Sequence, residues 1–229
     1  MQLKIVLRAG MPVVACAVAF CATEVWNTKV SSRWTAADAN LILNNSPWAK
    51  QVKTKTAASG GARRGGMGRR RDGYPTGGRG GANNSPMSAL VRWESAKPVQ
   101  EAETRVRELN APADSKPASG SADPFEKHYV VSVIGLRASG RQSGRSESRR
   151  DQLLTTTQLV RKNKTPIGPD DVKVKTEDGA NEIQFFFPKT SPISIEDKEV
   201  TFHSVIGRMT VEDKFDLKKM TRSGRLELD

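Results

Sequence analysis

Residues 129–136 read YVVSVIGL, an apolar run of strand length that decides how the rest of the chain is interpreted. A short run rich in β-branched residues is typical of a strand that is buried on both faces, so we expect it at the centre of a sheet. Residues 90–93 form a second, shorter strand candidate upstream of it. The chain between these two strands is interpreted as helical, because Pro98 can open a helix in which Val99, Ala102, Val106 and Leu109 recur at helical spacing.

Downstream of residue 170 the period changes to two. Val172 and Val174 alternate with lysines, and Asp178-Gly179 marks a turn before Ile183, Phe185 and Phe187. Two further strands follow, joined at Gly207-Arg208. Their apolar positions are Val200, Phe202, Met209, Val211, Phe215 and Leu217, and their polar positions are Thr210, Glu212, Lys214 and Asp216. Leu226 and Leu228 indicate a last strand. Such alternation predicts antiparallel strands with one face in the core.

A second helix is predicted over residues 148–161, with Leu153, Leu154, Thr157 and Val160 on one side. The order of elements predicts an α+β fold in which a mostly antiparallel sheet carries two helices on one face. This domain is expected to span residues 88–229. The strand order cannot be read from the sequence.

Residues 33–52 form a separate helical segment flanked by two tryptophans. Thr35 can cap its helix, with Asp38 completing a capping box. Because Trp34 and Trp48 are costly to expose, we expect the segment to dock on the domain or on a neighbouring subunit. The expected receiving surface is Met209, Val211, Phe215 and Leu217, or the groove beside the helices. The alternative is a free binding motif for another protein.

Residues 53–87 are a basic, low-complexity tract rich in glycine and arginine. Residues 53–83 hold eight basic residues against Asp72, so this short tract contributes +7 to a chain whose formal net charge is +12. Such a composition buries little, so the tract is interpreted as a disordered linker. A soluble spacer, a ligand for envelope polyanions and a nucleic-acid-binding segment all remain open, since mobile guanidinium groups pair with any polyanion. The candidate polyanion-binding residues are Arg63, Arg64, Arg69, Arg70, Arg71 and Arg79.

The N-terminus has the pattern of a secretory signal peptide over residues 1–22. Lys4 and Arg8 precede an uncharged apolar run with small residues near its end. The run is shorter than the roughly 20 residues of a membrane-spanning helix, so no such helix is expected in the mature chain. The segment before Cys16 also fits a lipoprotein cleavage site, with Cys16 as the lipidated residue. A buried element at the start of a cytosolic domain is a third interpretation.

The sequence holds no recognisable catalytic constellation. His128 and His203 are its two histidines, and no carboxylates stand near them at the spacing of a zinc site. No Gly-x-Ser-x-Gly elbow or dinucleotide-binding loop is present. We therefore expect neither an enzyme nor a cofactor, with a hydrolase of unfamiliar design as the alternative.

Several strings resemble a family of secreted acidobacterial proteins without an assigned function. They are 44–49 (NNSPWA), 91–96 (VRWESA), 187–193 (FPKTSPI), 196–202 (EDKEVTF) and 224–228 (GRLEL). The resemblance covers residues 33–52 and 88–228 and implies export, without implying any catalytic residue. Together these observations predict an exported, non-enzymatic envelope or secreted protein that is structural or binds a protein or polymer. The alternative function is nucleic-acid binding through the arginine-rich tract.

The first testable prediction is that the signal segment is removed during export. We expect the mature protein to begin between residues 17 and 24 and to be found outside the cytosol. Cell fractionation followed by N-terminal sequencing checks this. Cytosolic protein that retains Met1 would contradict export, and incorporation of labelled palmitate would show lipidation of Cys16.

Overall fold

The computed structural model describes residues 24–56, 87–111, 125–136, 146–177 and 180–229. The predicted signal peptide and Cys16 lie outside these residues, as does most of the basic tract. The class is α+β with antiparallel sheets, as the sequence predicts. The described strands form two main sheets where we expected one.

The first sheet has five strands. Its spatial order is β1 (Ala49–Lys53), β3 (Ser88–Trp93), β4 (His128–Leu136), β7 (Ala180–Pro188) and β6 (Asp171–Glu177). The second sheet has four, in the order β2 (Lys55–Thr56), β9 (Met209–Asp216), β8 (Glu199–Ile206) and β5 (Thr157–Arg161). A small hairpin of β10 (Thr221–Arg222) and β11 (Arg225–Leu226) follows. The strand with sequence YVVSVIGL is central in its sheet, which confirms the prediction.

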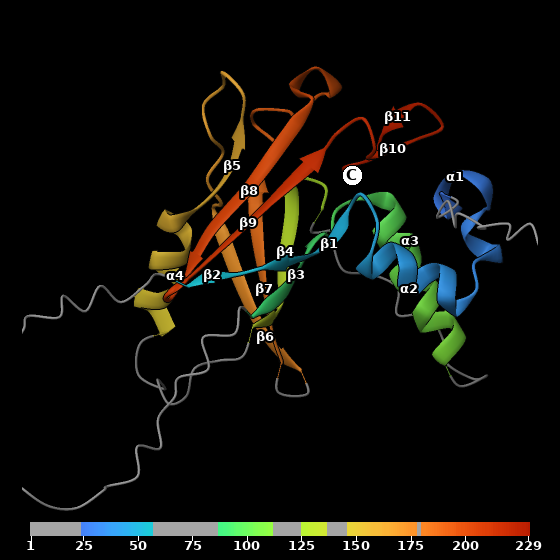
Figure 1. Cartoon of the computed structure of the whole chain (residues 1–229), viewed down its shortest axis with the longest axis horizontal. Coiled ribbons are helices and arrows are strands. Elements are labelled where there is room, and N and C mark those ends of the chain that lie inside the picture. Colours follow the sequence, from blue (N-terminus) through green and yellow to red (C-terminus); the bar gives the residue numbers. More distant parts are fainter. Residues whose placement is uncertain (1–23, 57–86, 112–124, 137–145, 178–179) are drawn as a thin grey trace, which may run out of the picture.

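The two main sheets pack face to face, with aromatic side chains between them. Trp93 on β3 meets Phe215 on β9 at 5.1 Å between ring centroids, and Phe202 on β8 lies 5.6 Å from Phe185 on β7. Figure 1 shows β8 and β9 crossing over β4 and β7. The alternating residues of β7, β8 and β9 supply the apolar inner faces, so the period of two in the sequence leads directly to this sandwich.

The helices lie at two places, and the expected pair does not share one face. Helices α1 (Val25–Thr28), α2 (Ala36–Asn44) and α3 (Lys97–Asn110) gather at one end of the molecule, with the 3-10 turn η1 (Ser31–Arg33), and α2 packs on α3. Helix α4 (Ser146–Thr156) lies against β8 and β6 at the other end. A second 3-10 turn, η2 (Ile195–Asp197), precedes β8.

The second predicted helix is too long. Instead of running to residue 161, α4 ends at Thr156, and residues 157–161 form β5 beside β8. Thr155 and Thr156 donate side-chain hydrogen bonds to carbonyls one turn back, at the end of the helix. From Thr157 onward alternate side chains are buried, and the Thr157 and Ser204 hydroxyl oxygens lie 2.8 Å apart between paired strands. Strand pairing thus prevails over a helical pattern that these residues also fit.

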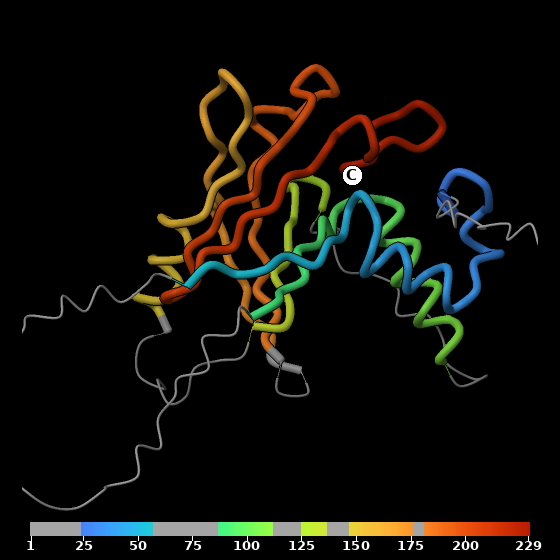
Figure 2. Tube along the Cα trace, in the orientation of Figure 1, coloured from blue at the N-terminus to red at the C-terminus, as the bar shows by residue number. Residues whose placement is uncertain are grey.

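The predicted boundary between the segment 33–52 and the linker 53–87 is also shifted. β1 extends to Lys53, and after one residue β2 begins and pairs with β9 of the second sheet. Figure 2 lets the reader follow this cyan trace from the helices along both sheets. The segment is therefore a helix followed by a strand that joins the sheets. Its capping box is present: the Thr35 hydroxyl accepts from the Asp38 amide, and the Asp38 carboxylate accepts from the Thr35 amide.

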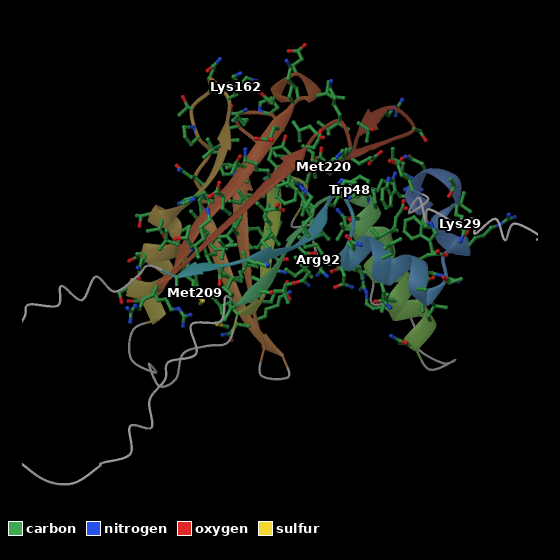
Figure 3. All side chains as sticks on the ribbon, in the orientation of Figure 1. Lys29, Trp48, Arg92, Lys162, Met209 and Met220 are labelled. Carbon is green, nitrogen blue, oxygen red and sulfur yellow. The ribbon has the colours of Figure 1, made fainter. Side chains whose placement is uncertain are left out.

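All four tryptophans of the chain are buried. Trp34, Trp48 and Trp93 have no exposed surface, and Trp26 is 6% exposed. Trp48 Nε1 donates to the Glu227 carbonyl at 2.7 Å, and its ring meets Trp26 edge-on at 5.4 Å. Figure 3 shows Trp48 near Met220, between the helices and the C-terminal strands. These contacts attach the N-terminal helices to the sandwich.

The second prediction compares two tryptophans of this cluster. Trp48→Phe should lower the free energy of unfolding by about 1–2 kcal/mol more than Trp26→Phe, because only the first change breaks a buried hydrogen bond. The matched control is Trp26, whose Nε1 is buried without a hydrogen-bond partner among the described residues. Urea unfolding measures both variants. Equal losses would show that the Trp48–Glu227 bond contributes no net stability.

Candidate functional site

The two ends of the basic tract are held together by the fold. The amide and the hydroxyl of Thr54 both donate to the Met87 carbonyl, at 2.8 and 2.9 Å. Directly before them, Lys53 of β1 pairs with Ser88 of β3 in an antiparallel ladder. The six candidate arginines at positions 63–79 lie outside the described residues. Their segment lies between β2 of the four-stranded sheet and β3 of the five-stranded sheet, which pack together, so it does not link two separate bodies.

A small pocket lies beside these ends, where β1 and β9 diverge. We name it the β1–β9 pocket. It has a volume of about 300 Å³ and is lined by Lys53, Lys55, Thr210, Glu212, Asp213 and Lys214. β9 pairs with β2 at Met209 and Thr210, whereas β1 pairs with β3 of the other sheet. The pocket therefore lies where the chain passes from one sheet to the other.

Lysines dominate the charge around the pocket. Lys55 lies 3.6 Å from Glu212, and Lys214 lies 3.1 Å from Glu199, with both lysines largely exposed. Lys53 makes no ion pair with any described residue. Exposed pairs of this kind contribute little free energy, so their lysines can exchange partners at low cost. The acidic groups of a ligand could therefore replace Glu212 and Glu199 as the partners of these ammonium groups.

Lys50 lies at the inner side of the same corner. Its Nζ is 3.9 Å from Asp213 Oδ1 and 5.4 Å from the centre of the Phe215 ring, and it donates to the Lys214 carbonyl. Burial raises the pKa of Asp213, while Lys50 and the Lys214 amide lower it. A carboxylate thus stands between the two sheets, where the neighbouring inward positions on β9 are apolar.

A second group of charges lies on the other face of the five-stranded sheet. Glu94, which is 3% exposed, accepts hydrogen bonds from Arg92 Nε at 2.8 Å and from the Ser132 hydroxyl. Arg92 also donates to Glu103 of α3 at 2.8 Å. Burial raises the pKa of Glu94 to about 7, although Arg92 acts against this rise. The Arg92 guanidinium pairs with the carboxylates of both Glu94 and Glu103. The net charge of these three side chains is therefore zero when Glu94 is protonated.

Sequence reasoning missed both buried carboxylates. Glu94 had one usable signal, because it follows Arg92 by two residues at the end of a strand, close enough for the ion pair that the structure shows. Asp213 had another, because it interrupts the apolar row of Val211, Phe215 and Leu217. The predicted docking residues Trp34 and Trp48 are both buried. Trp34 contacts Arg105 of α3 through its carbonyl and Arg222 through its ring.

The residues that were expected to receive Trp34 and Trp48 lie at two places in the fold. Val211, Phe215 and Leu217 are fully buried, with Phe215 packed against Trp93 between the sheets. Met209 pairs with Thr56, and Figure 3 labels it on the side away from helices α1, α2 and α3.

The two histidines do not lie together in a ligand set. His128 Nε2 is 3.0 Å from Asp170 Oδ2, and His203 on β8 pairs with Glu212 of β9 in the ladder. Among the described residues, no three His, Cys, Asp or Glu side chains are close enough to hold a metal ion.

No protein-family model, curated protein or solved structure matches this chain. In the part of the chain that the structure describes, no helix combines the length and the apolar character needed to cross a membrane.

The third prediction concerns Glu94. Its pKa is higher in the folded protein than in the unfolded chain, so its contribution to stability is complete below about pH 4.5 and is lost as the pH rises through about 7. Glu94→Gln should therefore remove about 2 kcal/mol of the decline in unfolding free energy between pH 5 and pH 8.

Urea unfolding at several pH values measures this difference. Glu108→Gln is the control, because Glu108 is an exposed carboxylate on α3 whose side chain is 57% exposed. It should keep the pH dependence of the unaltered protein. An unchanged slope in Glu94→Gln would show that Glu94 is ionised throughout this range.

Proposed function

We propose that this chain is an exported, non-enzymatic protein that binds anionic polymers of the cell envelope through its basic tract. The observation that carries the proposal is the pair of hydrogen bonds from Thr54 to Met87, which brings the two ends of the tract together. A segment whose ends meet cannot act as a spacer between two bodies. The spacer interpretation therefore loses its main support, and binding becomes the better explanation for the charge of the tract.

Loop length supports the same conclusion. Connections in β-hairpins usually have 2–5 residues, and loops beyond about 12–15 residues are uncommon without a functional role. Residues 57–86 lie between β2 and β3, and β3 pairs directly with β1, which ends one residue before β2. Closing such a long loop costs roughly 2 kcal/mol more than closing a tight turn, at about 0.6 kcal/mol per doubling of length. Because the fold bears this free-energy cost of loop closure, we infer that residues 57–86 have a function.

The chemistry of the tract suits polyanions in general. Arginine guanidinium groups pair with phosphate, sulfate or carboxylate groups and release the counterions of the polymer. Lys53 and Lys55, the first two basic residues of the tract, lie on the described strands β1 and β2. An exported protein meets acidic polymers of the envelope first, which is why we favour them over nucleic acid. The Arg-Gly strings favour nucleic acid as the second candidate, and it requires that the chain stay in the cytosol.

The fourth prediction tests binding through the tract. Changing Arg63, Arg64, Arg69, Arg70, Arg71 and Arg79 to Gln should weaken binding of the full chain to polygalacturonate and to polyphosphate alike. The slope of log affinity against log salt should fall by at most about 4–5, at roughly 0.7–0.9 per lost contact. Fluorescence titration over a range of salt concentrations measures both quantities.

A matched variant controls for net charge. It changes six exposed basic residues of the described strands and loops to Gln, namely Lys127, Lys162, Lys175, Arg208, Lys218 and Arg225. This variant loses the same charge and should keep most of the affinity. Equal weakening in the two variants would contradict a role for the tract. Tight binding to single-stranded RNA, with weak binding to the other polymers, would favour the nucleic-acid function.

A further inference from the structure

We propose that the free edge of β6 binds an acidic, extended segment of a partner protein as an additional strand of the five-stranded sheet. β6 is the last strand in the spatial order of that sheet, and among the described strands it pairs with β7 alone. An edge strand presents unpaired backbone N–H and C=O groups, to which an extended peptide can hydrogen-bond. This inference concerns a protein partner and does not depend on polymer binding through the basic tract.

The edge is accessible in the middle of β6. The three residues from Lys173 to Lys175 are exposed, and Val174 between them retains 52% of its accessible surface. Helix α4 makes an ion pair with the first residue of the strand, where Arg150 Nη2 lies 2.8 Å from Asp171 Oδ1. The surface that is open to a partner therefore begins beyond this ion pair, at Lys173.

The side chains of β6 select different residues at successive positions of an added strand. Side chains alternate between the two faces of a sheet, and directly opposed residues share a face. Val174 pairs with the core residue Ile183, whereas Lys173 and Lys175 lie on the other, outer face. An added strand would therefore place two residues, two positions apart, beside the lysines and the residue between them beside Val174.

The charges at the edge favour acidic residues at those two positions. Lys175 forms no ion pair with any described residue, Glu182 opposite it on β7 included. Lys173 Nζ lies 4.7 Å from the centre of the Phe186 ring. A contact of this kind is weak at an exposed site, so Lys173 can exchange it for a carboxylate at low cost. Both ammonium groups are thus available to an acidic strand.

A second copy of this chain does not fit the edge well. When β6 pairs with itself symmetrically about Lys173, Val174 or Lys175, lysine stands opposite lysine. Like charges in directly opposed positions destabilise a sheet, and lysines on edge strands are one means by which proteins prevent such pairing. The same charges attract a strand of opposite sign. The partner that fits is therefore an extended segment with two acidic residues and an apolar residue between them.

The experiment compares two blocked peptides of the same composition. One alternates glutamate and valine, and the other has a run of glutamates followed by a run of valines. Both carry the same charge, so the basic tract should attract them equally, whereas only the alternating peptide places all its carboxylates on one face of a strand. The full chain should bind the alternating peptide about tenfold more tightly, because two opposed charge pairs favour it. In an NMR titration, the backbone amide signals of residues 172–177 should shift.

Two double variants test the lysines. Lys173→Gln combined with Lys175→Gln should bind the two glutamate peptides about equally. Lys173→Glu combined with Lys175→Glu should bind a peptide that alternates lysine and valine more tightly than the unaltered protein does. Lys127→Gln combined with Lys218→Gln is the matched control at two other exposed positions and should keep the preference. Because all four positions are exposed, the melting temperatures should stay nearly unchanged.

The results decide between this inference and simple attraction by charge. Equal binding of the two glutamate peptides by the unaltered protein would overturn strand addition at β6. An unchanged preference after the two lysines are replaced by glutamine, or amide shifts confined to residues outside β6, would overturn it as well. The binding of polygalacturonate and polyphosphate is measured separately, so the proposed function can fail or stand independently of these results.

Discussion

The antiparallel pairing of β1 with β3 is the constraint on which most of this structure depends. It joins residues 49–53 to residues 88–93, so segments far apart in the sequence become neighbours in one sheet. The pairing places Trp48 against the C-terminal residues and brings the N-terminal helices to the end of the sandwich. It also holds the ends of the basic tract together through Thr54 and Met87. The position of the N-terminal helices and the closeness of the two ends of the basic tract thus both follow from the pairing of β1 with β3.

The two buried carboxylates, Glu94 and Asp213, differ in their hydrogen-bond partners. Glu94 has Arg92 and Ser132 as partners, and Arg92 in turn has Glu103. This closed network has the properties of a structural element, in which each charge is satisfied within the fold. Asp213 has a different environment, in which Oδ1 accepts from the Lys214 amide and Oδ2 is buried without a hydrogen-bond partner among the described residues. Burial raises the pKa of both groups, so the direction of the pKa shift does not separate them, whereas their hydrogen-bond partners do.

Local patterns predicted the strands, and non-local pairing explains what they could not predict. β4 was visible as an apolar run, and β7, β8 and β9 as a period of two that Phe186 and Asp213 interrupt. β1 was not visible, because residues 49–53 (AKQVK) show no apolar alternation and become a strand by pairing with β3. β5 fitted both a helix and a strand, and only its partner β8 decides between them. The division into two sheets depends on the crossing between β1 and β2. The basic tract was visible by composition, whereas the pocket beside it required the fold.

Under the proposed function, two groups of basic residues contribute in different ways. The six candidate arginines would supply attraction that acts on any polyanion and decreases with salt. Lys53 and Lys55 are held on paired strands, so the positions of their backbones are fixed before a ligand arrives. Groups that are fixed in advance lose less entropy on binding. The proposal therefore assigns the general attraction to the arginines and the pre-formed part of the binding surface to the strands that carry the two lysines.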